Sequence, residues 1–159
     1  MMANLRNFDN MTGRKAEDFV LKDHNVKPFT LAQYRGKRVL LSFHPLAFTP
    51  VCQEQMKSLE KNYEKFEALD TVPVGISIDS TFSKHAWAKI IGIKKLRMLS
   101  DFWPHGGVAQ KFGIFDDEAG FSKRANIIIG KDGRIEFMKV YEISELPDVN
   151  EIIEFLRIK

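Results

Sequence analysis

Short apolar runs of strand length alternate with segments of helical periodicity along most of this chain, and this alternation limits the possible folds most. The apolar runs at 39–43, 72–78, 96–99 and 125–129 have the length of buried strands. Between them, apolar residues recur every three or four positions, as in helices with one buried face. Alternating strands and helices predict an α/β fold with a central, largely parallel sheet covered on both faces.

Two expected hairpins depart from this alternation of strands and helices, one before it and one near its end. A first hairpin is expected between 19–21 and 29–31, and the turn Lys131-Asp132-Gly133 predicts a second one between 125–129 and 134–141. The second hairpin adds an antiparallel pair, and we expect an irregularity in its later strand at Met138. The expected helices lie at about 49–66, 80–92, 104–112 and 148–158. The helix that Ser80 can cap carries the apolar residues Phe82, Ala86, Trp87, Ile90 and Ile91.

Length and charge exclude several broad classes of protein. The 159 residues suit one domain, which we expect over 14–159, preceded by a polar, aperiodic extension over 1–13. The 24 basic and 21 acidic residues are interleaved, so the net charge of +3 predicts no binding to nucleic acid or an anionic membrane. No apolar run approaches the roughly 20 residues that span a bilayer. The first residues lack the apolar core of a signal peptide, and we expect a cytoplasmic protein.

The single cysteine, Cys52, lies where a predicted strand passes into a predicted helix. Thr49 is a good N-cap residue and Pro50 suits the first helical position, so Cys52 falls in the first turn. Free backbone N–H groups and the positive end of the helix dipole there favour a thiolate. The Thr49 hydroxyl can reach the sulfur, and Pro45 can stiffen the loop and shield it. A buried, inert cysteine is the alternative, but catalytic groups gather at the carboxyl ends of parallel strands.

The remaining residues offer no other familiar chemistry. One cysteine excludes a C-x-x-C exchange motif, and the four dispersed histidines provide neither metal-ligand spacing nor a Cys–His pair. No P-loop or dinucleotide glycine pattern is present. The sequence therefore predicts no cofactor and no metal.

Pro45, Thr49 and Cys52 form the pattern P-x-x-x-T-x-x-C, which resembles the active-site signature of the peroxiredoxins. The segments 39–45, 77–87, 100–106 and 122–129 resemble the family in the same order along the chain. The resemblance covers about residues 13–156 and is closest to the one-cysteine, AhpE-like branch of the thiol-specific antioxidant family. It implies a thioredoxin fold with an N-terminal extension and a central mixed sheet flanked by helices.

The resemblance implies a thiol-dependent peroxidase that reduces hydrogen peroxide or organic hydroperoxides through a sulfenic acid at Cys52. Because the chain has no resolving cysteine, an external small thiol, glutaredoxin-like protein or thioredoxin-like protein would have to regenerate it. The related bacterioferritin-comigratory type usually adds such a cysteine in its next helix. The resemblance also implies a homodimer. A thioredoxin-like redox sensor or chaperone without turnover is the alternative from another class.

Site residues follow by matching positions in the family pattern. Cys52 corresponds to the peroxidatic cysteine, Pro45 and Thr49 to its loop partners, and Arg124 to the guanidinium that contacts the sulfur. Because Arg124 is distant in the sequence from Cys52, only the fold can bring the two together.

Four further residues are weaker candidates for the pocket. Gln55 stands where many relatives carry Glu and could hold Arg124 through its amide oxygen. Phe48 could form an apolar wall of the peroxide pocket. His44 could tune access to the thiol or its ionisation, and Trp87 is expected to pack in the core near the site.

Overall fold

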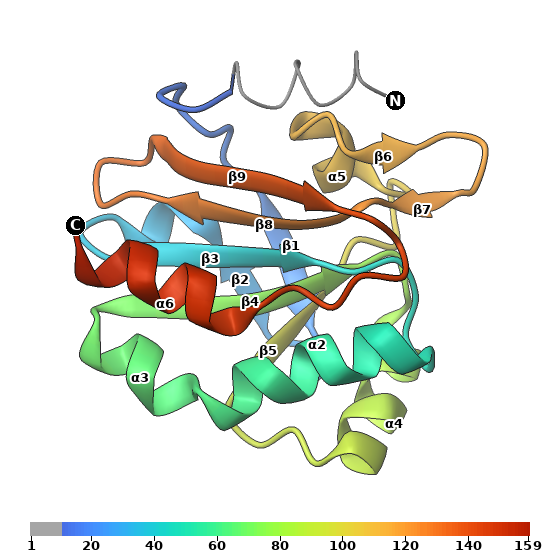
Figure 1. Cartoon of the computed structure of the whole chain (residues 1–159). Coiled ribbons are helices and arrows are strands. Elements are labelled where there is room, and N and C mark those ends of the chain that lie inside the picture. The colour runs from blue at the N-terminus through green and yellow to red at the C-terminus, as the bar shows by residue number, and fades with distance from the viewer. Residues whose placement is uncertain (1–10) are drawn as a thin grey trace.

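A seven-stranded mixed sheet forms the centre of the computed structural model, which describes residues 11–159 (Figure 1). In spatial order its strands are β2 (Pro28–Thr30), β1 (Val20–Asp23), β5 (Arg97–Ser100), β4 (Thr71–Ser77), β3 (Arg38–Phe43), β8 (Arg124–Ile129) and β9 (Ile135–Tyr141). The predicted α/β fold with a mixed sheet is confirmed. The expectation of a largely parallel sheet is wrong, because only β3, β4 and β5 run parallel and the other neighbouring pairs are antiparallel.

Helices cover both faces of this sheet (Figure 1). One face packs against α2 (Pro50–Lys61), α3 (Tyr63–Ala68), α4 (Thr81–Ile91) and α6 (Val149–Arg157). The other face packs against the 3-10 helix η1 (Leu31–Tyr34) and α5 (Gly107–Lys111). A separate two-stranded sheet, β6 (Phe115–Asp116) with β7 (Phe121–Ser122), follows α5 and was not expected from the sequence. None of the helices within residues 11–159 is long and apolar enough to cross a membrane.

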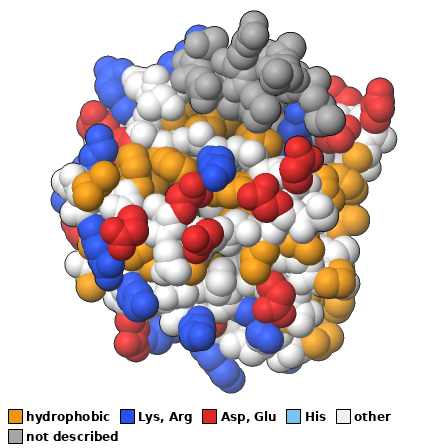
Figure 2. Space-filling view, in the orientation of Figure 1, with side chains coloured by type: hydrophobic (Ala, Val, Ile, Leu, Met, Phe, Trp, Pro, Cys, Tyr) orange, Lys and Arg blue, Asp and Glu red, His pale blue; other side chains and the backbone are white. Residues whose placement is uncertain are grey.

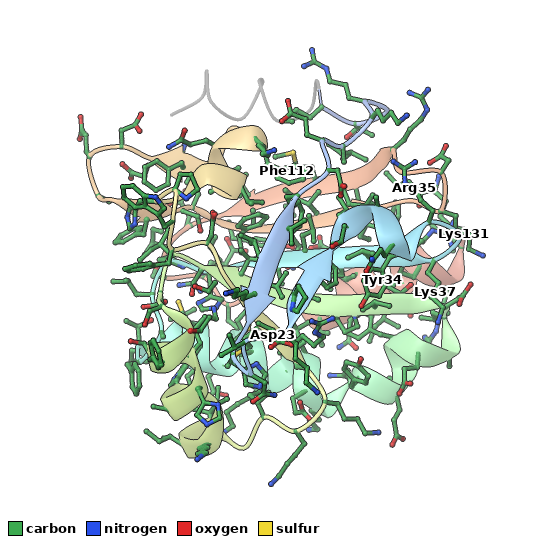
Figure 3. The ribbon with its side chains drawn as sticks, turned by 180° about the vertical axis from the view of Figure 1, so that it is seen from behind. Asp23, Tyr34, Arg35, Lys37, Phe112 and Lys131 are labelled. Carbon is green, nitrogen blue, oxygen red and sulfur yellow. The ribbon has the colours of Figure 1, made fainter. Side chains whose placement is uncertain are left out.

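Side-chain alternation along the strands divides the core into two layers. In β3, Val39, Leu41 and Phe43 face the layer beneath η1 and α5, whereas Leu40 faces the layer beneath the four longer helices. Seen from behind, Phe112 lies beneath α5, where its ring packs 6.0 Å from that of Phe43 (Figure 3). Burial on both faces explains why the central strands are nearly continuous apolar runs.

Local sequence signals place the helix ends well. Ser80 accepts a hydrogen bond from the Ser83 backbone N–H, and α4 stops at Gly92, which has the left-handed φ of 77°. Asp148 caps α6 in the same way, through the N–H of Asn150. The helix expected at 49–66 is divided at Asn62 into α2 and α3.

The inward face of α4 differs from the face that its apolar residues suggest. Phe82 and Ile90 are 83% and 71% exposed, whereas Lys84, Trp87 and Ala88 are buried. These three share one stripe, since they are spaced by three and four residues. The apolar pattern misses this stripe because its first member is a lysine.

The irregularity expected at Met138 lies two residues earlier in β9. Ile128 pairs with Phe137 and Ile129 with Ile135, so Glu136 is an extra residue in the strand. The bulge accompanies an ion pair between Arg38 and Glu136 at 2.7 Å. Most of the extension expected at 1–13 lies outside the described residues. Its last residue, Gly13, donates its N–H to the Ile135 carbonyl at 2.7 Å.

The strand directions bring several polar residues to one edge of the sheet. Because β3, β4 and β5 are parallel, their carboxyl ends meet there, at His44, Ser77 and Asp101. β8 runs antiparallel to β3, with Ala125 opposite Phe43, so it begins at the same edge with Arg124. Residues from four separate segments therefore converge at the start of α2.

Close packing of β4 against α2 should make Gly75 intolerant of a side chain. A Cβ built at Gly75 would clash with the Met56 sulfur, and Met56 is fully buried. We expect Gly75→Ala to lower the free energy of unfolding by about 1–3 kcal/mol, measured by urea denaturation. The matched control is Gly107→Ala, whose Cβ meets only ordinary contacts at 3.6 Å or more. Equal stabilities for the two variants would contradict this account of the packing.

Candidate active site

Cys52 is fully buried in the first turn of α2, as the sequence predicts. Thr49 is the N-cap residue and Pro50 the first helical residue, so the sulfur sits near the positive end of the helix dipole. The Thr49 hydroxyl, however, neither caps the helix nor bonds to the sulfur. It donates to the Leu46 carbonyl at 2.7 Å and thereby closes the loop that precedes the helix.

The Arg124 guanidinium lies directly beside this sulfur. Its Nη1 is 3.3 Å from Cys52 Sγ and 2.7 Å from Gln55 Oε1. Its other side donates twice to the Ile143 carbonyl, from Nε at 3.1 Å and from Nη2 at 2.7 Å. Arg124 is itself buried, so these contacts fix the guanidinium in one orientation. The structure thus brings Cys52, Arg124 and Gln55 together.

Gln55 links the guanidinium to the sheet without adding charge. Its amide nitrogen donates to Ser42 Oγ at 2.7 Å and to the Phe43 carbonyl at 3.2 Å, and its oxygen accepts from Arg124. The amide orientation is therefore determined by both ends. A neutral partner leaves the positive charge of Arg124 directed at the sulfur.

A cavity of about 250 Å³ opens onto this group. Its lining consists of Pro45, Leu46, Thr49, Pro50, Val51, Cys52, Phe121, Arg124, Ile143 and Ser144. Pro50, Ile143 and Ser144 are exposed and form the rim, whereas Cys52 and Arg124 are buried and lie deepest. The cavity suits a small molecule with a polar end that reaches the sulfur and the guanidinium.

The weaker pocket candidates do not line this cavity. Phe48 is a correction, because it is 55% exposed and packs against Trp87 in a tilted arrangement, with 6.2 Å between ring centroids. Its backbone has a left-handed φ of 65°. Trp87 is buried and packs near the site, as expected, against His44. Gln55 acts on Arg124 from behind the cavity.

Two cavity walls come from segments without a recognisable sequence signal. Phe121 belongs to β7, which is two residues long, and Ile143 follows β9 in an irregular segment. Neither position has a periodic pattern that points to a ligand. Their placement depends on how β8 and β9 are inserted beside β3.

A buried lysine behind the active-site loop also escaped sequence reasoning. Lys84 is fully buried, and its ammonium contacts Ser77 Oγ at 2.5 Å and His44 Nε2 at 3.2 Å. Burial lowers the pKa of Lys84 to about 7. Burial and the nearby lysine also hold the pKa of His44 well below its usual value. The spacing of three residues between Lys84 and Trp87 on α4 is the signal that could have identified the buried lysine.

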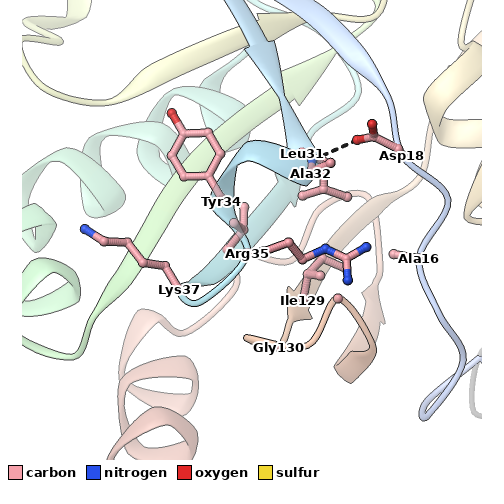
Figure 4. Close-up of a pocket in the computed structure, with 11 residues that line it drawn as sticks. Ala16, Asp18, Leu31, Ala32, Tyr34, Arg35, Lys37, Ile129 and Gly130 are labelled. Atoms are coloured by element: carbon pink, nitrogen blue, oxygen red, sulfur yellow. Dashed lines mark hydrogen bonds between the residues drawn. The ribbon is translucent and has the colours of Figure 1, made fainter.

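Two further cavities lie away from Cys52. One, of about 280 Å³, is lined by His24, Asn25, Val26, Thr81, Phe82 and His85. The cavity in Figure 4 has room for about one water molecule, with a volume of about 10 Å³. It lies at the opposite end of β3, where Asp18 accepts the Ala32 N–H at 2.8 Å. Figure 3 shows Arg35, Lys37 and Lys131 at that end of the molecule. Within residues 11–159, no group of three His, Cys, Asp or Glu side chains is placed to hold a metal.

Comparison with known proteins shows the family to which the chain belongs. The sequence pattern of the AhpC/TSA family matches residues 12–138. The chain is 39% identical over 137 residues to alkyl hydroperoxide reductase E of Mycobacterium tuberculosis, covering 86% of this chain and 89% of that protein. It is 34% identical over 150 residues to a peroxiredoxin of Thermoplasma volcanium, covering 91% and 72%.

Solved structures show the same architecture. The reduced 2-Cys peroxiredoxin of Plasmodium vivax superposes with a TM-score of 0.86 at 27% identity, covering 92% of this chain and 80% of that one. AhpC of Enterococcus faecalis superposes with a TM-score of 0.86 at 25% identity, covering 93% and 91%. With its thioredoxin-like fold and its single cysteine at the start of α2, this chain belongs to the AhpC/TSA family and is a peroxiredoxin of the one-cysteine type.

Proposed function

We propose that this thiol-dependent peroxidase uses Cys52 as its nucleophile and Arg124 as the cation that supports it, with Pro45 and Thr49 shaping the loop. The contact of 3.3 Å between Arg124 Nη1 and the Cys52 sulfur, at the inner end of a cavity, carries this proposal. Both groups are buried, so their attraction is weakly screened by water. The pairing favours the ionised sulfur that peroxide reduction needs.

The reaction begins when the ionised sulfur attacks one oxygen of a hydroperoxide. An S–O bond forms, the O–O bond breaks, and the second oxygen leaves with the electron pair and takes up a proton as an alcohol or water. Cys52 becomes a sulfenic acid. An external thiol then forms a mixed disulfide and releases water, and a second thiol restores Cys52 and leaves as a disulfide.

Arg124 can also stabilise the charge that develops on the peroxide. Four of its five N–H groups are used on Cys52, Gln55 and Ile143. The fifth, on Nη2, has no hydrogen bond to the described part of the chain. It belongs to a guanidinium that lines the cavity, and it can donate to a peroxide oxygen as the bond breaks.

Exposed apolar side chains support the proposed homodimer. Several large apolar side chains on α4 and on the loops after β1, β3 and β5 are exposed, namely Val26, Phe48, Phe82, Phe102 and Trp103. Figure 2 shows apolar side chains along the edge of the molecule where α4 and the loop after β5 lie in Figure 1. Such clustering is typical of a surface that a partner covers. The cytoplasmic location and the identity of the thiol stay predictions.

Replacing the nucleophile tests the proposal most directly. We expect Cys52→Ser to reduce peroxide consumption in the presence of excess thiol to the uncatalysed background, because no other cysteine can replace it. In the unaltered protein, mass spectrometry after one equivalent of hydrogen peroxide should show one oxygen added at Cys52. The circular dichroism spectrum of the variant should match that of the unaltered protein. A single oxidation without turnover by any thiol would favour the redox sensor instead.

Arg124 should contribute mainly to the oxidation step. We expect Arg124→Met to slow the reaction of Cys52 with hydrogen peroxide by about 10²–10³-fold, measured by stopped-flow fluorescence, because it removes a fixed donor and the adjacent cation. Arg157→Met, at an exposed position, removes the same charge as a control. Arg124→Lys retains the charge without the fork and should recover part of the rate. A rate equal to the control would remove Arg124 from the site.

Thr49 should act through its hydroxyl. Thr49→Val preserves the shape but loses the bond to the Leu46 carbonyl, and we expect it to slow oxidation of Cys52 by about tenfold. Thr49→Ser keeps the hydroxyl and should stay within about twofold of the unaltered rate. A parallel loss of thermal stability and rate in both variants would make Thr49 merely structural.

A further inference from the structure

Lys84 is an unusual choice for a fully buried position. An ammonium removed from water is costly unless it is paired with an opposite charge. Its two direct partners, Ser77 and His44, carry no formal negative charge. A methionine would fill the same space between α4 and the sheet without this cost. The lysine therefore calls for a role other than packing.

The contacts of Lys84 extend to the start and the middle of the short loop that precedes Thr49. One partner, His44, is the residue immediately before Pro45. The other, Ser77, donates to Asp79 Oδ2 at 2.6 Å, and the same oxygen accepts the Ala47 N–H at 2.8 Å. The hydrogen bonds thus connect the ammonium to the start of the loop directly and to its middle through two residues.

The charges around Lys84 include the reactive sulfur itself. The ionisable groups that face it are His24, His44, Cys52, Asp79 and Asp101. Negative charge on Asp79, Cys52 and Asp101 favours the ammonium, but burial outweighs it and lowers the lysine pKa from 10.5 to about 7. Coulombic attraction acts on both partners, so the ammonium in turn attracts negative charge on the Cys52 sulfur. Both histidine pKa values are lowered by burial.

We infer that Lys84 is a positioning residue for peroxide reduction, a buried cation that holds the active-site loop through His44 and Ser77 and favours the Cys52 thiolate while it is protonated. This inference rests on the proposed function of Cys52. Below about pH 7 the ammonium is present and supports the thiolate. Above that pH the amine is neutral, so its electrostatic effect is lost while the hydrogen bond to Ser77 persists.

A pH series on matched variants tests this role. Lys84→Met removes the charge at nearly constant volume, and Lys89→Met removes the same charge from the exposed face of the same helix. The rate of Cys52 oxidation by hydrogen peroxide and its alkylation by iodoacetamide should be measured from about pH 5.5 to about pH 9. We expect Lys84→Met to be about three- to tenfold slower than Lys89→Met at about pH 6, with the difference shrinking to about twofold at about pH 9.

The effect of protonated Lys84 on the stability of the fold should be opposite to its effect on the reactivity of Cys52. In the folded protein the pKa of Lys84 is about 7. In the unfolded chain the lysine keeps its proton up to about pH 10.4. The unfolded state therefore binds more protons between these two pKa values, and stability rises with pH across that window. The lysine destabilises the fold most below about pH 7, so Lys84→Met should not lower the Tm there.

Ser77→Ala gives a second, independent measurement. It removes an acceptor of the ammonium, so Lys84 should lose its proton at lower pH. The support that Lys84 gives to the reaction of Cys52 should therefore decline at a lower pH than in the unaltered protein. This variant retains the lysine and applies even if Lys84→Met does not fold.

The outcomes separate the inference from the proposed function. A rate ratio between Lys84→Met and Lys89→Met that stays constant with pH, or a break in the Ser77→Ala profile that does not move, would overturn the role of Lys84. Should the unaltered protein fail to react with hydrogen peroxide while alkylation still shows the pH-dependent ratio, the proposed peroxidase fails and the coupling of Lys84 to Cys52 stands.

Discussion

The contact between Arg124 and Cys52 depends on the direction of one strand. Because β8 runs antiparallel to β3, its first residue lies beside the end of β3, where the chain turns into α2. A guanidinium 72 residues away in the sequence is thereby held 3.3 Å from the sulfur. The Ile143 carbonyl and Gln55 fix its plane, so the charge cannot turn away from the thiol.

Behind this contact lies a second polar layer that the cavity does not reach. His44, Ser77 and Lys84 lie between the active-site loop and α4, packed against the ring of Trp87. The His44 Nδ1 and Trp87 Nε1 atoms are buried there without hydrogen-bond partners within the described chain. Such unsatisfied groups are rare in protein interiors, and sites that serve a reaction are where they tend to be retained.

The sequence predicts those parts of the site in which residue type and local structure agree. Cys52 and Thr49 could be placed because a strand, an N-cap and a proline at the first helical position follow one another within a few residues. The order along the chain of the seven strands of the main sheet follows from the same local patterns, whereas β6 and β7 do not. Arg124 could be assigned only through the family resemblance, because no local rule brings two such distant segments together.

Other parts of the structure could not be read from local patterns. The inward face of α4 includes a lysine, so hydrophobic periodicity pointed to Phe82 and Ile90, which are exposed. Phe48 lies within the motif, yet its ring packs against Trp87 and does not line the cavity. Phe121 and Ile143 line the cavity only because tertiary packing brings irregular segments there.

The neutral side chain at Gln55 has a consequence for the oxidised protein. Of the groups that the Arg124 guanidinium contacts, only the Cys52 sulfur can carry a full negative charge. Conversion of the thiolate to an uncharged sulfenic acid leaves a buried cation without its counter-ion, which is unfavourable. Electrostatics therefore favours the reduced form of Cys52. Reduction of the sulfenic acid at the end of each turnover restores the negative charge beside Arg124.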